Sequence, residues 1–338
     1  MSRAEQPPLT IWAVSDGRTG IEAQALGLAE AVARLRPAEV VIKRIGWKAG
    51  LGRLPTALIP PSPALLRPES GMAPPWPDIW IAAGRATLPL SRAMRARSQG
   101  RTFVVQTQHP RGALEAFDLV IPPAHDEVSG PNVFPILGAP NRLTPEKLAD
   151  ELARWEDRLS PLPRPRIAVI VGGKSRAFDL PQAQAAELAR RIGEAIDAAG
   201  GSLMLSFTRR TPADARATMA GGLCHLPGLI WDDRGENPYF AFLAAADAIV
   251  ITEDSTNLAT DAAATGRPVY VLPLAGGSAK FRRFHADLQA RGVSRPFEGR
   301  FETWSYPPLR ETQRAAAELL WRYDGRPEAA RIAGEGGS

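Results

Sequence analysis

The chain has 338 residues, with 41 Lys and Arg against 36 Asp and Glu, and a net charge of +5. This length suggests two domains, and 44% hydrophobic with 23% charged residues excludes a mainly disordered protein. The single cysteine, Cys224, excludes an internal disulfide and a cysteine-based zinc cluster. The four histidines form no HExxH pair, so we predict no metal site.

Composition and patterning also give expectations about location and partners. Met1 to Thr10 contains no apolar run typical of a secretory signal, and no run approaches the ~20 residues of a membrane span. We therefore expect a cytoplasmic protein. No block of five or more like charges occurs, which argues against nucleic-acid binding. The charge then indicates either an arginine-rich solvated surface or attraction to phosphate, on a substrate or on an anionic membrane.

Short apolar runs alternate with helical patterns along the first half. A helix is predicted over Thr19–Leu35, where Ile21, Ala25, Leu28 and Val32 form one stripe. The predicted strands are Leu9–Ser15, Val40–Ile45, Asp78–Ala83, Thr102–Gln106 and Asp118–Ile121. Trp47–Pro77 is rich in proline and leucine and has no clear stripe. It is either an irregular cover over the sheet or an apolar and basic patch that contacts a membrane or a lipid-linked acceptor.

The second half repeats this alternation. Strands are predicted at Arg166–Val171, Ser202–Phe207, Ala248–Thr252 and Val269–Leu272, and helices at Gln182–Ala199, Pro238–Ala246, Asn257–Thr265 and Glu311–Tyr323. These strands are apolar on both faces, as in a parallel sheet covered by helices. The sequence therefore predicts an α/β protein with two Rossmann-like doubly wound domains facing a cleft.

Leu159–Arg166 is proline-rich and predicts a stiff connection between the domains. We expect an N-terminal domain over 1–158, a linker over 159–166, a C-terminal domain over 167–310, and a helix and tail over 311–338. Ligands of such sheets bind beyond the carboxyl ends of the strands.

The strongest candidate site follows the strand that ends at Thr252. Small polar residues come directly after it: Glu253, Asp254, Ser255, Thr256 and Asn257. A helix that starts here offers free amide hydrogens to a phosphate group, and Asp261 could accept two ribose hydroxyls. The alternative is an N-cap by Asp254 or Ser255 and a solvated Asp261.

A glycine turn follows the strand at Arg166–Val171. It comprises Gly172, Gly173, Lys174 and Ser175. Glycines let the backbone approach an anion, and the following side chains supply donors; a tight turn with exposed bases is the alternative. Arg209 and Arg210 follow the next strand and point to the same site or are surface charge. Asn237 opens a helix and either contacts the ligand or caps that helix.

Three residues of the first half are candidate bases. Asp16 lies in the turn between the first strand and its helix, while His125 and Asp126 follow a later strand. Imidazole titrates near neutral pH and suits general-base chemistry. Adjacent residues on an extended segment usually point apart, so a hydrogen-bonded loop histidine is the equal alternative.

Asp261-Ala-Ala-Ala-Thr-Gly-Arg-Pro-Val is similar to the E-A-x-x-x-G-x-P-V signature of GT-B glycosyltransferases, with Asp261 in place of Glu. Val171-Gly-Gly-Lys-Ser resembles the glycine turn of the lipid-linked N-acetylglucosaminyltransferase of peptidoglycan synthesis. The whole chain resembles the elongated-mitochondria (mitochondrial fission factor) family. The matching stretches are Asp16-Gly-Arg-Thr-Gly with Gln24, His125-Asp126, Gly172-Gly173, Arg209-Arg210-Thr-Pro, Asn237-Pro-Tyr, Thr252-Glu-Asp-Ser and Gly266-Arg-Pro-Val.

The resemblance implies a metal-independent GT-B-type glycosyltransferase. It would use a nucleotide-diphosphate sugar as substrate, with no other cofactor, and an unknown acceptor that is lipid-linked or part of the envelope. Two alternatives remain open: a nucleotide-sugar epimerase on the same fold, and a non-catalytic adaptor associated with division at a membrane.

Overall fold

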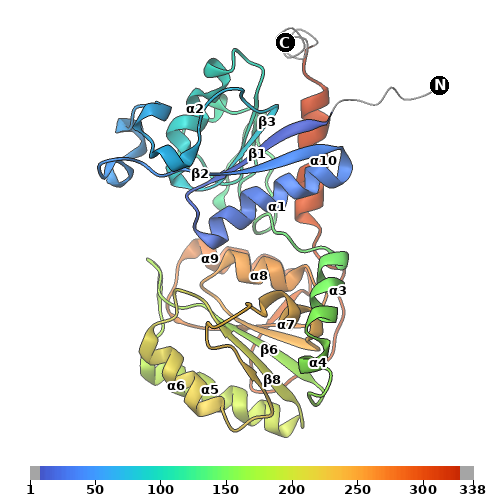
Figure 1. The fold of residues 1–338 in the computed structure, drawn as a ribbon. Helices are drawn as coiled ribbons and strands as arrows, with labels where there is room; N and C mark the ends of the chain where they lie inside the picture. Colours follow the sequence, from blue (N-terminus) through green and yellow to red (C-terminus); the bar gives the residue numbers. More distant parts are fainter. Residues whose placement is uncertain (1–7, 328–338) are drawn as a thin grey trace, which may run out of the picture. The chain divides into compact units, whose positions relative to one another are not determined.

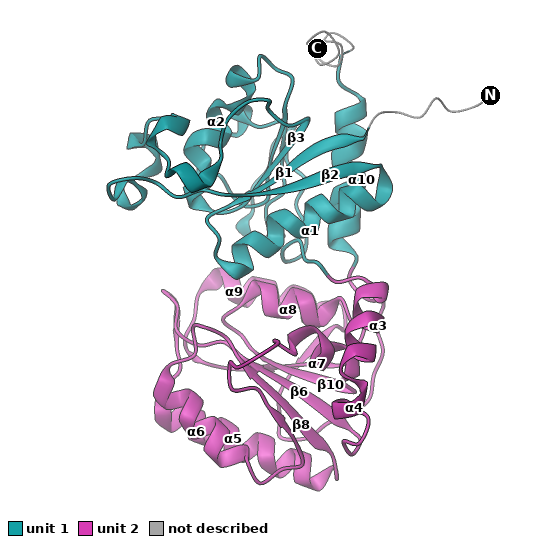
Figure 2. Cartoon of the chain, viewed as in Figure 1, with its two compact units in different colours: residues 1–142, 310–338 teal, residues 143–309 magenta. Residues whose placement is uncertain are grey.

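The computed structural model describes residues 8–327. The prediction that no secretory signal is present concerns Met1 to Thr10, and most of this segment lies outside the described residues. The end of the predicted C-terminal tail also lies outside them. The chain divides into two compact units, coloured separately in Figure 2. Unit 1 comprises residues 1–142 and 310–338, and unit 2 comprises residues 143–309. Within residues 8–327, none of the helices combines the length and apolar character that crossing a bilayer requires.

Unit 1 contains a parallel sheet in the order β2-β1-β3-β4-β5, of which β1, β2 and β3 are labelled in Figure 1. Its strands are β1 (Leu9–Ser15), β2 (Ala38–Arg44), β3 (Ile79–Ala82), β4 (Phe103–Gln106) and β5 (Leu119–Val120). Its helices are α1 (Thr19–Leu35), α2 (Leu88–Arg97) and α10 (Glu311–Asp324). Successive side chains of a strand point to opposite faces of the sheet, so unit 1 has a core on each face. Ile11 packs with α1 and α10, whereas Trp12 packs on the side of α2.

The segment at 47–77 forms the outer layer of the second core. It contains four short 3-10 turns, at Leu51–Arg53, Thr56–Leu58, Pro63–Leu65 and Pro68–Ser70. Trp47, Ile59 and Leu66 are buried against Trp80 and its neighbours. The prediction of an irregular cover over the sheet is therefore confirmed for the inner side of this segment.

Unit 2 contains a six-stranded parallel sheet in the order β13-β11-β10-β6-β8-β9. Its strands are β6 (Arg166–Val171), β8 (Ser202–Phe207), β9 (Gly228–Ile230), β10 (Ala248–Thr252), β11 (Val269–Leu272) and β13 (Ser294–Pro296). A small antiparallel pair joins β7 (Phe178–Asp179) to β12 (Ala275–Gly276). The helices are α3 (Pro145–Arg154), α4 (Glu156–Leu159), α5 (Gln182–Ala198), α6 (Ala213–Leu223), α7 (Tyr239–Ala245), α8 (Thr256–Ala263) and α9 (Ala279–Ala290).

Both sheets have the strand orders of doubly wound α/β domains. From the first strand of unit 2, β6, the chain goes to β8 and β9 on one side and then to β10, β11 and β13 on the other. In unit 1 the corresponding reversal separates β1 from β3. Such reversals leave a crevice outside the carboxyl ends of the two flanking strands, where ligands of these folds bind. The predicted α/β class with two Rossmann-like domains is confirmed.

The boundary between the two units does not lie at the predicted linker, residues 159–166. Unit 2 already begins at Leu143 because α3 packs along α7, with the Lys147 ammonium 4.7 Å from the Phe240 ring centre. The proline-rich stretch Leu159–Arg166 runs inside unit 2, where Ser202 Oγ donates to the Pro163 carbonyl at 2.6 Å. The last helix, α10, joins unit 1.

Candidate functional site

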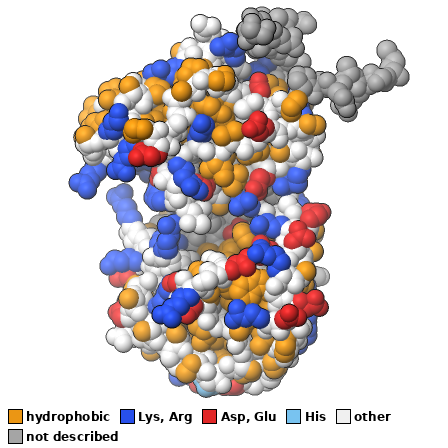
Figure 3. All heavy atoms as spheres, viewed as in Figure 1, with side chains coloured by type: hydrophobic (Ala, Val, Ile, Leu, Met, Phe, Trp, Pro, Cys, Tyr) orange, Lys and Arg blue, Asp and Glu red, His pale blue; other side chains and the backbone are white. Residues whose placement is uncertain are grey.

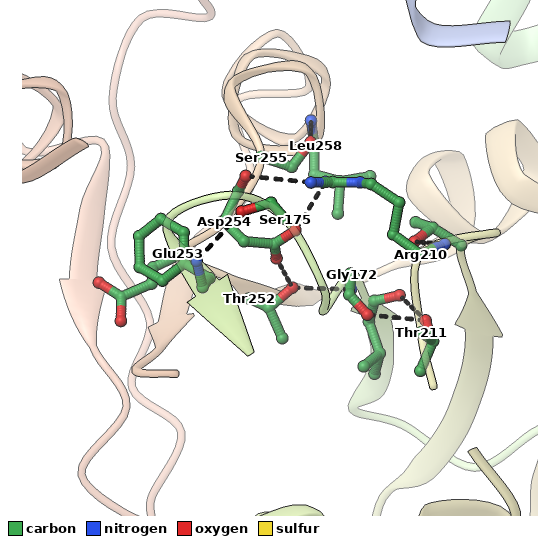
Figure 4. Close-up of polar contacts among 12 residues, drawn as sticks. Gly172, Ser175, Arg210, Thr211, Thr252, Glu253, Asp254, Ser255 and Leu258 are labelled. Carbon is green, nitrogen blue, oxygen red and sulfur yellow. Dashed lines mark hydrogen bonds and ion pairs between the residues drawn. The ribbon is translucent and has the colours of Figure 1, made fainter. Parts of the chain in front are cut away.

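The candidate site lies where the strand order of unit 2 reverses. β6 and β10 are hydrogen-bonded neighbours there, and each ends in a polar loop. The loop after β6 carries Gly172 to Ser175, and the loop after β10 carries Glu253 to Ser255 and leads into α8. The loop after β8, with Arg210 and Thr211, joins them (Figure 4).

Thr252 is the centre of a buried network. Its Oγ1 accepts a hydrogen bond from the Gly172 amide at 2.7 Å and donates to Asp254 Oδ1 at 2.7 Å. The side chain of Asp254 is fully buried, and its Oδ2 lies 2.6 Å from Arg210 Nη2. Burying a carboxylate is costly unless it is paired, so Arg210 is needed to hold Asp254 in this position.

The loop after β8 is fixed to the loop after β6 by hydrogen bonds to backbone groups. Thr211 Oγ1 lies 2.8 Å from the Val171 carbonyl and 2.7 Å from that of Gly172, and the Lys174 amide donates to the Arg210 carbonyl at 2.8 Å. Together with the Thr252 network, these bonds hold three loops from three strands as one platform (Figure 4).

The two glycines after β6 make this packing possible. A Cβ on Gly172 would lie 2.2 Å from Asp254 Oδ1, and a Cβ on Gly173, whose φ is +144°, would lie 2.9 Å from the Arg210 carbonyl oxygen. The glycines therefore bring the loops of the platform into contact with each other.

Helix α8 begins on this platform. Its N-cap is Ser255, whose Oγ accepts from the Leu258 amide at 3.4 Å. The first amide hydrogens of a helix have no partner inside the helix, and the helix dipole adds positive potential there. The structure thus confirms Ser255 as a cap, and the start of α8 keeps the features that suit an anion.

Two exposed cations follow the glycines. Lys174 and Arg176 form no ion pair with any other described residue. Ser175, which lies between them, instead closes the turn, because its Oγ accepts from the Phe178 amide at 3.1 Å. Arg209 is exposed, whereas its neighbour Arg210 is bound to Asp254.

Glu253 points away from the platform. Its Oε1 accepts from the Leu274 amide at 2.7 Å, and its carbonyl oxygen lies 2.9 Å from His285 Nε2 on α9. Burial lowers the pKa of His285, so the imidazole is neutral near pH 7 and Nε2 donates to this carbonyl. Glu253 and His285 therefore fix the path of the turn between β10 and α8.

Asp261 is bound to a neighbouring helix. The hydroxyl of Tyr239, at the start of α7, donates to Asp261 Oδ2 at 2.8 Å. Burial raises the pKa of Asp261 to about 7, although the Tyr239 hydrogen bond acts in the opposite direction. Asp261 is therefore partly protonated at neutral pH. Asn237 lies just before the N-cap residue of α7, Pro238, and its Oδ1 accepts from the Tyr239 amide at 3.0 Å.

The candidate bases of the first half all lie in unit 1. Asp16 follows β1 and accepts from Arg18 through the backbone amide at 3.2 Å and Nε at 2.8 Å. His125 and Asp126 lie in one 3-10 turn after β5; His125 is buried, whereas Asp126 is only partly buried. The two neighbours therefore have different environments.

The residues that bind the platform together were only partly predicted. Gly172, Gly173, Arg210, Asp254 and Ser255 meet as expected, but Thr252, Thr211 and His285 were not among the candidate site residues. One signal for Thr252 existed: it is the only polar residue of Ala248–Thr252 and stands at the carboxyl end of that strand. His285 carries no such signal, because it reaches Glu253 from a helix 32 residues away.

Comparison with known proteins gives one family and a set of related folds. A family model described as Mitochondrial fission ELM1 matches residues 19–323. The Mitochondrial fission protein ELM1 of Arabidopsis thaliana is 32% identical over 276 residues, which cover 72% of this chain and 63% of the plant protein. This chain thus spans less than two thirds of the plant relative. An uncharacterized protein of Rickettsia prowazekii is 27% identical, with 91% of this chain and 97% of that protein covered.

Two solved structures are similar to this chain over nearly its whole length. A proposed UDP-N-acetylglucosamine 2-epimerase from Listeria monocytogenes matches with a TM-score of 0.51 at 12% identity, covering 98% of this chain and 92% of that chain. The glycosyltransferase SnogD from Streptomyces nogalater matches with a TM-score of 0.49 at 16% identity, covering 98% of both chains. At these identities the likeness concerns the fold alone.

Proposed function

The chain belongs to the mitochondrial fission ELM1 family, and from this premise we propose that it is a GT-B-type glycosyltransferase. Unit 2 binds a nucleotide-diphosphate sugar, and the sugar passes to an acceptor on unit 1, which is lipid-linked or belongs to the envelope. One observation carries the proposal: α8 begins at the strand-order reversal of unit 2, on the platform to which the Lys174 backbone is hydrogen-bonded.

In this proposal the diphosphate occupies the start of α8. The amide hydrogens of the first turn and the ammonium of Lys174 stabilise the negative charge that develops on the leaving diphosphate. Arg176 and Arg209, which are both exposed, add positive potential around the same loops. Arg210 acts indirectly, because its guanidinium neutralises the buried Asp254 and so keeps the platform rigid.

The nucleoside and the acceptor use the remaining residues. Asp261 accepts hydrogen bonds from the ribose hydroxyls with the carboxylate oxygen that Tyr239 leaves open. A base from unit 1 removes the acceptor proton, with His125, Asp126 and Asp16 as the candidates.

A second enzymatic function is favoured by the fold match to the proposed epimerase from Listeria. An epimerase would convert the nucleotide sugar with no acceptor present, whereas a glycosyltransferase leaves the nucleotide sugar unconverted until an acceptor is added. The name of the plant relative instead favours an adaptor in fission. An adaptor would convert no nucleotide sugar under either condition.

The test is a thermal-shift screen with nucleoside diphosphates and nucleotide sugars. A ligand present at 100 times its Kd stabilises the native state by about 2.7 kcal/mol, so a binder gives a clear rise in Tm. Asp261→Ala should abolish this rise, whereas Asp287→Ala, at an exposed acid on α9, should preserve it. An unchanged rise in Asp261→Ala would refute the ribose assignment, and no rise with any nucleotide would refute the proposed function.

A further inference from the structure

The irregular segment of unit 1 at residues 47–67, here called the cover loop, has a second face. Its inner residues, such as Trp47 and Ile59, are buried in the core of unit 1. Its outer face exposes Leu54 and Leu58, with 40% and 65% of their surface accessible. Because the loop already has a core of its own, these two leucines are available for a contact outside unit 1.

The charge around the cover loop is positive and not neutralised. Five cations lie on the loop or reach it from α2 and the turn before it: Lys48, Arg53, Arg67, Arg85 and Arg97. None of them forms an ion pair with another described residue. The only acid between residues 47 and 77 is Glu69.

Three of these cations donate hydrogen bonds to backbone carbonyls of the loop. A carbonyl oxygen carries no formal charge, so these bonds do not neutralise the cations. Lys48 Nζ donates to the Ala64 carbonyl at 2.9 Å, Arg85 Nη2 to that of Leu54 at 2.5 Å, and Arg97 Nε to that of Pro61 at 3.1 Å. In the space-filling view, Lys and Arg side chains lie among hydrophobic ones at the left of unit 1 (Figure 3). The cover loop thus presents leucines within a field of positive charge.

The remaining two cations line a surface cavity in the same loop, which is largely open to solvent. It has a volume of about 490 Å³ and is lined by Trp47, Ala49, Gly50, Gly52, Arg53 and Arg67. Both arginines are exposed, and neither guanidinium has a hydrogen-bond partner among the described residues. Guanidinium groups bind phosphate oxygens in a bidentate manner, so this cavity has the chemistry of a phosphate-binding site.

We propose that the cover loop docks on an anionic phospholipid bilayer. A lipid phosphate binds in the cavity to Arg53 and Arg67, while Leu54 and Leu58 enter the boundary between head groups and acyl chains. The excess of unpaired cations selects a negatively charged surface, and two leucines suit shallow insertion better than the larger apolar area of a protein interface. This inference concerns unit 1 and does not depend on sugar transfer.

The test measures sedimentation of the full chain with vesicles of phosphatidylcholine, with or without phosphatidylglycerol. Each cation near an anionic surface strengthens binding by about fivefold, so Arg53→Gln combined with Arg67→Gln should weaken it by roughly 25-fold. The matched control is Arg282→Gln with Arg291→Gln, which removes two exposed, unpaired arginines from unit 2. This control should bind the vesicles nearly as tightly as the chain without substitutions does.

The leucines are tested separately. Leu58→Ser should weaken binding by about tenfold, whereas Leu35→Ser, at another exposed leucine of unit 1, should leave it unchanged. Equal binding to vesicles with and without phosphatidylglycerol would overturn the proposal, as would full binding by the Arg53 and Arg67 variant. Inorganic phosphate that raises Tm through these arginines, without vesicle binding, would assign the cavity to a free anion and exclude docking.

Discussion

At Gly172, the requirement for glycine comes from a neighbouring side chain. The φ of Gly172 is not in the left-handed region, so another residue could adopt its backbone conformation. The obstacle is the buried carboxylate of Asp254, both of whose oxygens would lie within 2.6 Å of a Cβ. Asp254 has little freedom to move, because Thr252 and Arg210 hold it from two sides.

We therefore expect Gly172→Ala to destabilise unit 2. Forcing a methyl group into such a packed site costs about 1–3 kcal/mol, and the distorted platform should also lose nucleotide binding. The matched control is Gly221→Ala on α6, where a Cβ meets nothing within 4 Å and alanine should stabilise the helix. Urea unfolding of both variants checks this. Equal midpoints for Gly172→Ala and the unchanged chain would contradict the account of the platform.

Gly172 was predicted as a site residue from the sequence, but the group that requires a glycine there could not be predicted. A glycine after a buried strand predicted a close approach of the backbone to an anion. In the structure the approaching group is a carboxylate of the same chain, 82 residues further on. Contacts over such separations depend on strand order, which local patterns do not determine.

At the level of elements, α7 and α8 are joined by a hydrogen bond to a carboxyl group whose pKa is raised. Asp261 and Tyr239 join these helices, and burial raises the pKa of Asp261 from 3.8 to about 7. As pH rises above 3.8, the unfolded chain loses this proton before the folded chain does. The folded state then binds more protons than the unfolded state, so the free energy of unfolding falls as pH rises toward 7.

We expect Asp261→Asn to remove this dependence while keeping an acceptor for Tyr239. Between pH 4 and 7 the ionisation of Asp261 lowers the free energy of unfolding by at most about 1.4 kcal/mol for each pH unit. The variant should therefore be more stable than the unchanged chain at pH 8 and converge with it near pH 4. Urea midpoints across this range, with Asp287→Asn as the exposed control, measure the difference. Parallel curves for Asp261→Asn and the unchanged chain would show that Asp261 is ionised normally.

Elements with uniform patterns were predicted closely, and irregular ones were not. The predicted limits of β1, β6, β8, β10, β11 and α1 agree with the structure. Most of these strands are apolar runs that end at, or just before, polar or glycine residues, and β11 ends before Pro273, so burial and turn chemistry act at the same positions. The cover loop has no such period, because its buried residues are fixed by separate contacts with β3 and α2.

At the level of the whole molecule, the chain passes between the units twice, near residues 142 and 309. The proline-rich stretch predicted as the linker is instead a connection between α4 and β6, where Arg166 donates its amide to Asp247 Oδ2 at 2.8 Å. Proline content indicates stiffness but not which unit a stiff segment packs against. The role of α3 in unit 2 depends on its contact with α7, 90 residues away in the sequence, which no local pattern records.

Because unit 1 includes residues 310–338, we expect deletion of these residues to unfold unit 1 but not unit 2. Deleting residues 310–338 removes α10, whose Ala315, Ala316 and Leu319 are fully buried in the core with α1. Burial of Leu319 alone contributes about 1.5–3 kcal/mol, so unit 1 should unfold or aggregate in the fragment 1–309. The fragment 143–309 keeps its whole sheet and the platform around Thr252, and it should fold alone.

Thermal unfolding followed by circular dichroism, together with gel filtration, distinguishes these outcomes. Fragment 143–309 should show one cooperative transition, elute as a monomer and give the same rise in Tm with a bound nucleotide as the full chain does. Fragment 1–309 should keep only the transition of unit 2. A folded 143–309 fragment that has lost the rise would mean that residues of unit 1 complete the nucleotide site. A stable unit 1 in fragment 1–309 would mean that α10 is dispensable, despite its place in the core.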